Sequence, residues 1–211
     1  MRRPNRTGHS RRDVLKIGGS SLAGTVLTAG CTGSGIPGQG STATGVSDTV
    51  TMEPVGSVSF DSPPETVVAE WGFVADVLTA LGHADTVEAM MDPSFWYTGF
   101  YEELDGVPVR DQYSIPTIGT HDALQRETLY GLGADLLAVD PNKLITTYGL
   151  DGDDIAELET NAAPFFGNHS RDSRGDDWPN YPSGEPYRYY TISEFVAKYG
   201  RVFDEAERAA A

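Results

Sequence analysis

Cysteine is almost absent from this sequence of 211 residues, which contains a single one, Cys31. A lone thiol cannot form an internal disulfide and leaves no cysteine-based metal site. Lysine is also scarce, because Lys143 and Lys198 are the only two after residue 30. Such a chain has no stripe of positive charge to neutralise phosphates, so nucleic acid is excluded as a partner.

Long apolar runs are missing as well. The weakly apolar segment 14–29 is interrupted by Gly18, Gly19 and Gly24, and it is shorter than the roughly 20 apolar residues that a membrane-spanning helix needs. Basic residues precede it, among them the pair Arg11 and Arg12. This layout is typical of an export signal and resembles the twin-arginine type, with Val14 where that pattern usually has Phe.

The letters TAGC at residues 28–31 resemble the lipobox of lipoproteins, in which a peptidase cuts before a cysteine that then carries lipid. We therefore expect a signal peptide at 1–30 and a lipid-anchored Cys31 on the outer face of the cell membrane. A chance free thiol is the alternative. One lipid chain binds a membrane only marginally, so the anchor is expected to carry two or more.

Acidic residues dominate the rest of the chain. Residues 1–30 hold six of the 15 Lys and Arg and one of the 31 Asp and Glu, which leaves nine basic and 30 acidic side chains and a net charge of −21. Self-repulsion of this size is relieved where salt shortens the screening length to about 3 Å. The composition is typical of a salt-loving microbe such as a halophilic archaeon, and an ordinary acidic domain is the alternative.

The sequence divides into four parts: the signal at 1–30, a flexible linker with the lipidated cysteine at 31–52, an α/β lobe at 53–190, and a long helix at 191–211. Short apolar strands are expected at 66–71, 86–91, 116–120, 134–140 and 162–167. Helices are expected between them, at 72–82, 92–104, 121–133, 141–149 and 151–160. This alternation predicts an open, mostly parallel sheet flanked by helices, in which ligands bind beyond the carboxyl ends of the strands.

The segments at 64–87 and 116–140, together with the closing helix, resemble substrate-binding proteins of ABC importers. The branch is the one that captures ferric siderophores, haem or cobalamin, in which one rigid helix joins two α/β lobes around the ligand. The resemblance covers 55–211 and implies the N-terminal, Rossmann-like lobe and the start of the interdomain helix, with the second lobe absent. Ala134 stands where the family usually has proline.

The resemblance implies a non-catalytic binding protein without a cofactor, partnered by an ABC permease and a small metal chelate. Glu127 falls where the family has a glutamate that pairs with an arginine of the permease. The resemblance, taken together with the strand ends and the aromatic residues, indicates the expected ligand contacts. These are Trp71, Asp92, Trp96, Tyr97, Thr120, Asp140, Asn142, Phe166, His169, Trp178 and Tyr181.

Other interpretations stay open at this point. Bare Fe(III) could bind Tyr97, Tyr101 or Tyr181, and a metal-dependent enzyme could use His83, His121 and His169 with Asp172, Asp176 and Asp177. A truncated fragment without transport activity is a third alternative. Asn168, His169 and Ser170 also form an N-glycosylation triplet.

The charge excess gives a first prediction. The melting temperature is expected to rise as KCl is raised from about 0.1 M to about 2 M, because the screening length falls from about 10 Å to about 3 Å or less. Thermal unfolding followed by circular dichroism measures this. A melting temperature that stays level or falls over this range would contradict the halophilic interpretation.

Overall fold

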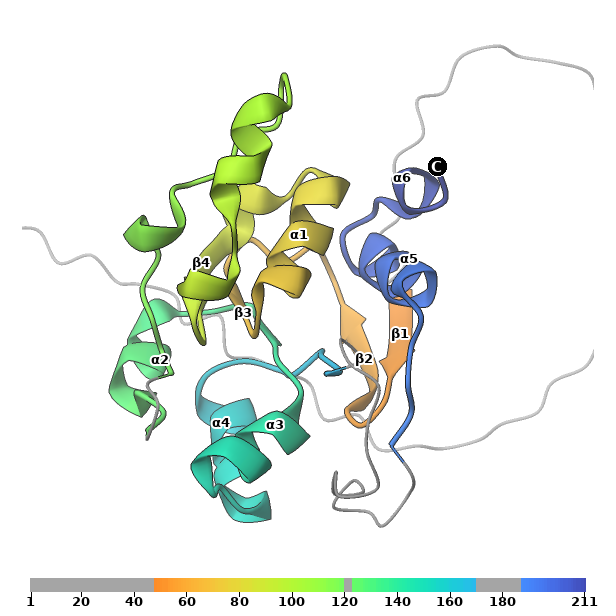
Figure 1. The fold of residues 1–211 in the computed structure, drawn as a ribbon. Helices are drawn as coiled ribbons and strands as arrows, with labels where there is room; N and C mark the ends of the chain where they lie inside the picture. The colour runs from red at the N-terminus through yellow and green to blue at the C-terminus, as the bar shows by residue number, and fades with distance from the viewer. Residues whose placement is uncertain (1–47, 120–122, 170–186) are drawn as a thin grey trace, which may run out of the picture. The chain divides into compact units, whose positions relative to one another are not determined.

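A parallel sheet forms the centre of the fold, with β3 (Val67–Ala69) between β4 (Val87–Met90) and β5 (Leu136–Ala138). The computed structural model describes residues 48–119, 123–169 and 187–211, which belong to one compact unit at 43–211. The fold is therefore mixed α/β, as the alternation of strands and helices predicts. Figure 1 shows α1 and α5 on one side of β3, and α3 and α4 on the other.

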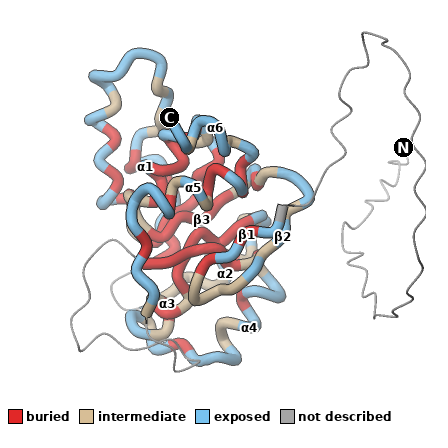
Figure 2. The backbone as a smooth tube through the Cα atoms, turned by 90° about the vertical axis from the view of Figure 1, so that its right-hand side faces the viewer, coloured by how far each residue is buried: buried red, intermediate tan, exposed pale blue. Residues whose placement is uncertain are grey.

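Both faces of this sheet are covered. Successive strand residues point to opposite faces, and in β3 Val67 and Ala69 join one hydrophobic cluster while Val68 joins the other. β5 divides in the same way, with Leu136 and Ala138 on the first face and Leu137 on the second. Figure 2 shows the resulting buried centre in red. Continuous apolar runs are what a parallel sheet buried on both faces requires.

Single bridges extend the sheet at each side. Thr117 bridges Met90 in parallel, and Phe165 bridges Leu137 in parallel. The strands expected at 116–120 and 162–167 are thus reduced to isolated bridges. Their positions place the segments in the order 117, β4, β3, β5, 165, so the chain reverses its winding direction between β3 and β5. That switch point is where ligands bind in open α/β sheets.

Helix α1 (Gly72–Leu81) starts directly at the end of β3. A Cβ at Gly72 would lie 2.0 Å from the carbonyl oxygen of Phe95, so only glycine lets the segment after β4 pack against this helix start. The helix ends at Gly82, which adopts φ 90° in the left-handed region. The 3₁₀ turn η1 (Ala84–Thr86) then leads into β4.

The prediction of one α-helix at 92–104 is wrong. Two 3₁₀ segments, η2 (Pro93–Phe95) and η3 (Thr98–Glu103), replace it, and η4 (Gln112–Ser114) follows. Asp92 does cap the start, because its side chain accepts a hydrogen bond from the Ser94 amide. The run 94–104 mixes buried and exposed aromatic residues without a regular 3.6-residue period, so no single α-helix can bury them all.

Three helices cover the second face: α2 (Arg126–Leu132), α3 (Pro141–Tyr148) and α4 (Gly152–Asn161). Asp140 caps α3 through the Asn142 amide, and Asp151 caps α4 through the amides of Asp153 and Asp154. Arg126 links α2 to α4 by an ion pair with Asp154 at 2.7 Å. These helices close the face below the sheet in Figure 1.

A β-hairpin precedes the sheet. β1 (Asp48–Met52) pairs with β2 (Gly56–Phe60) in antiparallel register. β1 lies inside the range 31–52 expected to be a flexible linker, so the folded unit begins earlier than the sequence indicates. Val50 and Met52 are fully buried, which explains why this segment is ordered.

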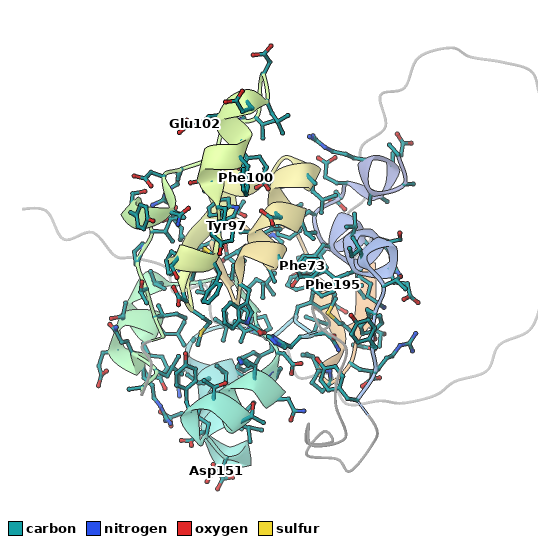
Figure 3. All side chains as sticks on the ribbon, in the orientation of Figure 1. Phe73, Tyr97, Phe100, Glu102, Asp151 and Phe195 are labelled. Atoms are coloured by element: carbon teal, nitrogen blue, oxygen red, sulfur yellow. The ribbon has the colours of Figure 1, made fainter. Side chains whose placement is uncertain are left out.

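The closing helix is broken. α5 (Ile192–Val202) and α6 (Ala206–Ala209) replace the continuous helix expected at 191–211. Asp204 between them has φ 57°, a left-handed conformation that ends an α-helix. Figure 3 shows Phe73 of α1 beside Phe195 of α5, and their ring centroids are 4.8 Å apart. The apolar stripe of α5 is therefore covered by this unit itself.

Substitutions on α5 test this packing. Phe195→Ala is expected to lower the free energy of unfolding by about 3–5 kcal/mol, because the ring is fully buried against Phe73 and Tyr199. Ile192→Ala on the same helix is the control; its side chain is 70% exposed, so a change within about 0.5 kcal/mol is expected. Urea unfolding measures both, and equal losses would contradict the assigned burial.

Candidate functional site

Two carboxylates lie at the topological switch point. Glu70 follows β3 and Asp140 follows β5, and both are buried, with 3% and 0% of their surface exposed. The Asp140 amide donates to Glu70 Oε2 at 2.8 Å, so the two strand ends are joined directly. Buried carboxylates need partners, and the segment after Phe165 supplies them.

His169 completes a buried network. Its Nδ1 contacts Glu70 Oε1, and its amide donates to Asp140 Oδ2 at 2.9 Å. The Tyr187 hydroxyl donates to the same Asp140 oxygen at 2.6 Å, and the Asn142 amide donates to Oδ1 at 2.8 Å. Residues distant in sequence are thus tied to one carboxylate pair, which fixes the geometry of the strand ends.

Burial changes the acidity of Asp140. Loss of solvation and, to a lesser extent, the nearby negative charge of Glu70 raise its pKa to about 6. The hydrogen bonds from Tyr187, His169 and Asn142 act in the opposite direction. Asp140 is therefore a carboxyl group that takes up a proton near neutral pH.

Trp71 lies beside this network at the surface. Its ring centroid is 4.5 Å from that of Phe95 in an edge-to-face arrangement and 5.9 Å from that of His169. Lys143 Nζ lies 5.4 Å from the Trp71 ring centroid, within the range of a cation–π contact. Three strand ends therefore contribute to one half-exposed aromatic surface.

A small pocket adjoins this surface. It has a volume of about 280 Å³ and is lined by Gly72, Phe73, Asp76, Phe95 and Tyr97. Tyr97 is 60% exposed and Phe95 is 39% exposed, so both rings can be reached from solvent. Figure 3 shows Tyr97 beside α1 and below Phe100.

Tyr101 contacts Asp76 of this pocket and is a poor source of tyrosinate. Its hydroxyl donates to Asp76 Oδ1 at 2.6 Å. Burial, followed by the hydrogen bond to Asp76 and the charge of Asp76, raises the pKa of Tyr101 to about 12. A phenolate ligand for bare Fe(III) would thus be costly to form at this position.

Tyr148 approaches the same edge from the end of α3. A Cβ at Gly119 would lie 2.3 Å from its hydroxyl oxygen, so Gly119 leaves room for this group. Burial raises the pKa of Tyr148, and the charges of Asp92 and Glu70 raise it further. The neutral hydroxyl is therefore favoured among the carboxylates that follow β3 and β4.

The expected ligand residues have different fates. Trp71, Asp92 and Tyr97 lie at the accessible edge, while Asp140, Asn142 and His169 lie just behind it. Trp96 and Phe166 are fully buried in the core, which argues against direct ligand contact. Both residues occur within apolar runs, so their rings pack in the hydrophobic core. Thr120, Trp178 and Tyr181 lie outside the described residues.

Sequence reasoning missed Glu70, Phe95, Lys143 and Tyr148. Glu70 interrupts an apolar strand just before Trp71, and a charged residue at the end of a buried strand is the signal that could have found it. Lys143 is one of only two lysines after residue 30, which is a further signal. No feature of the sequence distinguishes Phe95 and Tyr148 from the other aromatic residues.

The metal-dependent enzyme is not supported by the part of the chain that the structure describes. There, no group of three or more His, Cys, Asp or Glu side chains is arranged to hold a metal ion. His83 follows the last turn of α1, whereas His169 contacts Trp71 before its first turn. Ten helical residues, about 15 Å, separate these two ends. His121, Asp172, Asp176 and Asp177 lie outside the described ranges.

The glycosylation triplet is inaccessible at its acceptor. Asn168 is 3% exposed, and its Nδ2 donates to the carbonyl oxygens of Glu53 and Arg188 at 2.7 and 3.1 Å. Glycan attachment would remove these bonds. Asn168 is therefore a structural residue that links the hairpin to the segment before α5.

Glu127 belongs to α2, which contributes no residue to the pocket beside Trp71. Glu127 is exposed in the first turn of α2, as a surface contact requires. Arg11, Arg12 and Cys31 lie outside the described residues. Within 48–119, 123–169 and 187–211, no helix is long and apolar enough to cross a membrane.

No protein-family model and no curated protein matches this sequence. Solved structures with a similar fold exist. The petrobactin-binding protein of Bacillus subtilis is 14% identical over 78% of this chain and 47% of its own, with a TM-score of 0.49. The vitamin B12-binding protein of Vibrio cholerae is 12% identical over 70% and 45%, with a TM-score of 0.41.

A molybdate-binding protein of Haemophilus influenzae gives a TM-score of 0.49 at 13% identity, over 77% of this chain and 48% of its own. The chain spans about half the length of these solved structures.

The raised pKa of Asp140 gives a prediction with a definite sign. Because the folded state holds this proton more tightly than the unfolded state, Asp140 lowers the free energy of unfolding as the pH rises from about 4 to about 6, by up to about 3 kcal/mol. Asp154 and Glu194, whose hydrogen bonds lower their pKa, act oppositely at more acidic pH. The wild type therefore has to be compared with a variant.

Asp140→Asn is the suitable variant because it removes the titration. The wild-type minus variant difference in unfolding free energy is expected to fall between about pH 4 and pH 6 and then to level off. Urea unfolding at each pH measures it. A difference that does not change with pH would contradict the assigned pKa.

Proposed function

We propose that this chain is an extracytoplasmic solute-binding lipoprotein that delivers an iron chelate to an ABC import permease. The ligand is a ferric siderophore, with haem and cobalamin as related candidates. The observation that carries the proposal is the accessible aromatic edge at the switch point, formed by Trp71, Phe95 and Tyr97 with Lys143 beside them. The sequence resemblance to siderophore-binding importer proteins points to the same ligand class.

The chemistry of the edge favours binding. Aromatic rings stack on the planar, partly apolar groups of a chelate, and a lysine ammonium attracts its oxygen donors. Glu70, Asp140 and His169 bond one another behind the rings, so they hold the edge in shape. An edge fixed before binding lowers the entropy cost of association.

The remaining parts of the proposal follow from surface and sequence. Glu127 is proposed to dock on the permease, since it is exposed on α2 and matches the position of the family's docking glutamate. Cys31 is proposed to carry the lipid, with Arg11 and Arg12 directing export. These assignments rest on the motifs in the sequence.

Calorimetric titration tests the ligand class. The purified protein is titrated with ferrioxamine B, ferric enterobactin, haem and cyanocobalamin. Binding of at least one chelate is expected, and Trp71→Ala is expected to weaken it by about tenfold or more, because stacking on an aromatic ring contributes on the order of 1–3 kcal/mol.

Tyr113→Ala is the matched control. This tyrosine is 82% exposed and is not among the residues that line the pocket beside Trp71. Its removal should leave the affinity unchanged. No heat with any of the four compounds, or equal losses in both variants, would overturn the proposal.

A further inference from the structure

A second and larger pocket lies at the opposite end of α1. Its volume is about 490 Å³, within the range of small-molecule sites. The lining comes from the end of α1, η1, α6 and the segment before η4, namely Thr79, Gly82, Ala84, Asp85, Gly106, Val107, Pro108, Val109, Arg110 and Arg208. Trp71 precedes the first turn of α1 and Gly82 follows its last, so this pocket is separate from the aromatic edge.

Two arginines from distant parts of the sequence meet at this pocket. Arg208 Nε donates to the Ala80 carbonyl oxygen at 2.7 Å, which anchors the side chain against the end of α1. Arg110 Nη1 donates to the Val87 carbonyl oxygen at 3.2 Å and to Glu88 Oε2 at 3.1 Å. Each guanidinium group is thus held in place by hydrogen bonds from one of its three nitrogen atoms.

The other two nitrogen atoms of each guanidinium group are available to bind a ligand. Among the described residues, Nη1 and Nη2 of Arg208 and Nε and Nη2 of Arg110 have no hydrogen-bond partner. Gly82 makes room for the first of these groups, since a Cβ there would lie 2.7 Å from Arg208 Nη1. Anchored guanidinium groups lose little entropy when they bind an oxyanion.

The charge of this pocket contrasts with the chain. After residue 30 there are nine basic and 30 acidic side chains, yet this pocket has two arginines and one carboxylate, Asp85. The Thr79 hydroxyl donates to the Ala75 carbonyl oxygen, so its proton is already used. Val107, Pro108 and Val109 supply an apolar wall. Such a lining suits a molecule with one oxyanion group and a short apolar body.

We propose that this pocket is a second ligand site, which binds a small organic oxyanion through Arg110 and Arg208. The apolar part of the ligand lies against residues 107–109. A carboxylate is preferred because a guanidinium fork pairs with its two oxygens in one plane. The site is independent of the chelate site at Trp71, so either proposal can fail without the other.

The test is an NMR titration of the ¹⁵N-labelled protein with benzoate, phenyl phosphate, inorganic phosphate and benzamide. Benzoate is expected to shift the amide signals of Gly82, Ala84 and Gly106, and uncharged benzamide to have no effect. Phenyl phosphate distinguishes the two oxyanions, and inorganic phosphate tests the need for an apolar body. Equal shifts with benzamide, or shifts elsewhere only, would overturn the proposal.

Substitutions in the pocket are expected to change benzoate affinity in opposite directions, which a loss of packing alone would not do. Arg208→Gln and Arg110→Gln are each expected to weaken benzoate binding about tenfold. Asp85→Asn is expected to tighten it, because the variant removes a like charge. Arg201→Gln, an exposed arginine of α5 outside the pocket lining, is the matched control and should bind as the wild type does. Loss in Arg201→Gln equal to that in Arg208→Gln, or no tightening in Asp85→Asn, would contradict the site.

Discussion

The contact on which the rest depends is made by the Glu70 carboxylate at the end of β3. One oxygen accepts the Asp140 amide, and the other contacts His169. Three segments that are 29 to 99 residues apart in sequence are therefore fixed to one buried group. A buried carboxylate is costly without partners, so this arrangement holds the turn after β5 and the segment after Phe165 in one geometry. The aromatic edge around Trp71 is built on that support.

The sheet could be predicted well because two of its three strands, β3 and β5, are apolar without interruption. Residues 67–69 and 136–138 are buried on both faces, and a sequence pattern reports that condition directly. The segments at Thr117 and Phe165 form only bridges, each held by two backbone hydrogen bonds to the neighbouring strand. Pattern alone does not distinguish a strand from one bridged residue.

The aromatic segment and the last helix show where sequence reasoning stops. Residues 92–104 contain an N-cap, a proline and apolar residues, which are the signals of an α-helix, yet close packing of Phe95 on Gly72 imposes 3₁₀ turns. The apolar period at 192–203 ends just before Asp204, and no glycine or proline marks the break there. Tertiary contacts decided both cases. Trp96 and Tyr97 were both expected to contact the ligand. The Trp96 ring is instead in the core, whereas the Tyr97 ring is exposed.

The aromatic edge is the centre of this account, and NMR mapping with a diamagnetic chelate tests it most directly. Gallium(III) desferrioxamine, added to the labelled protein, is predicted to shift the amide signals of Glu70, Trp71, Gly72 and Lys143. Signals of α4, which lies away from the edge, are predicted not to move. Shifts confined to α4 or to the pocket at Arg208, or no shifts at all, would contradict the assignment of the ligand site to the carboxyl ends of the strands.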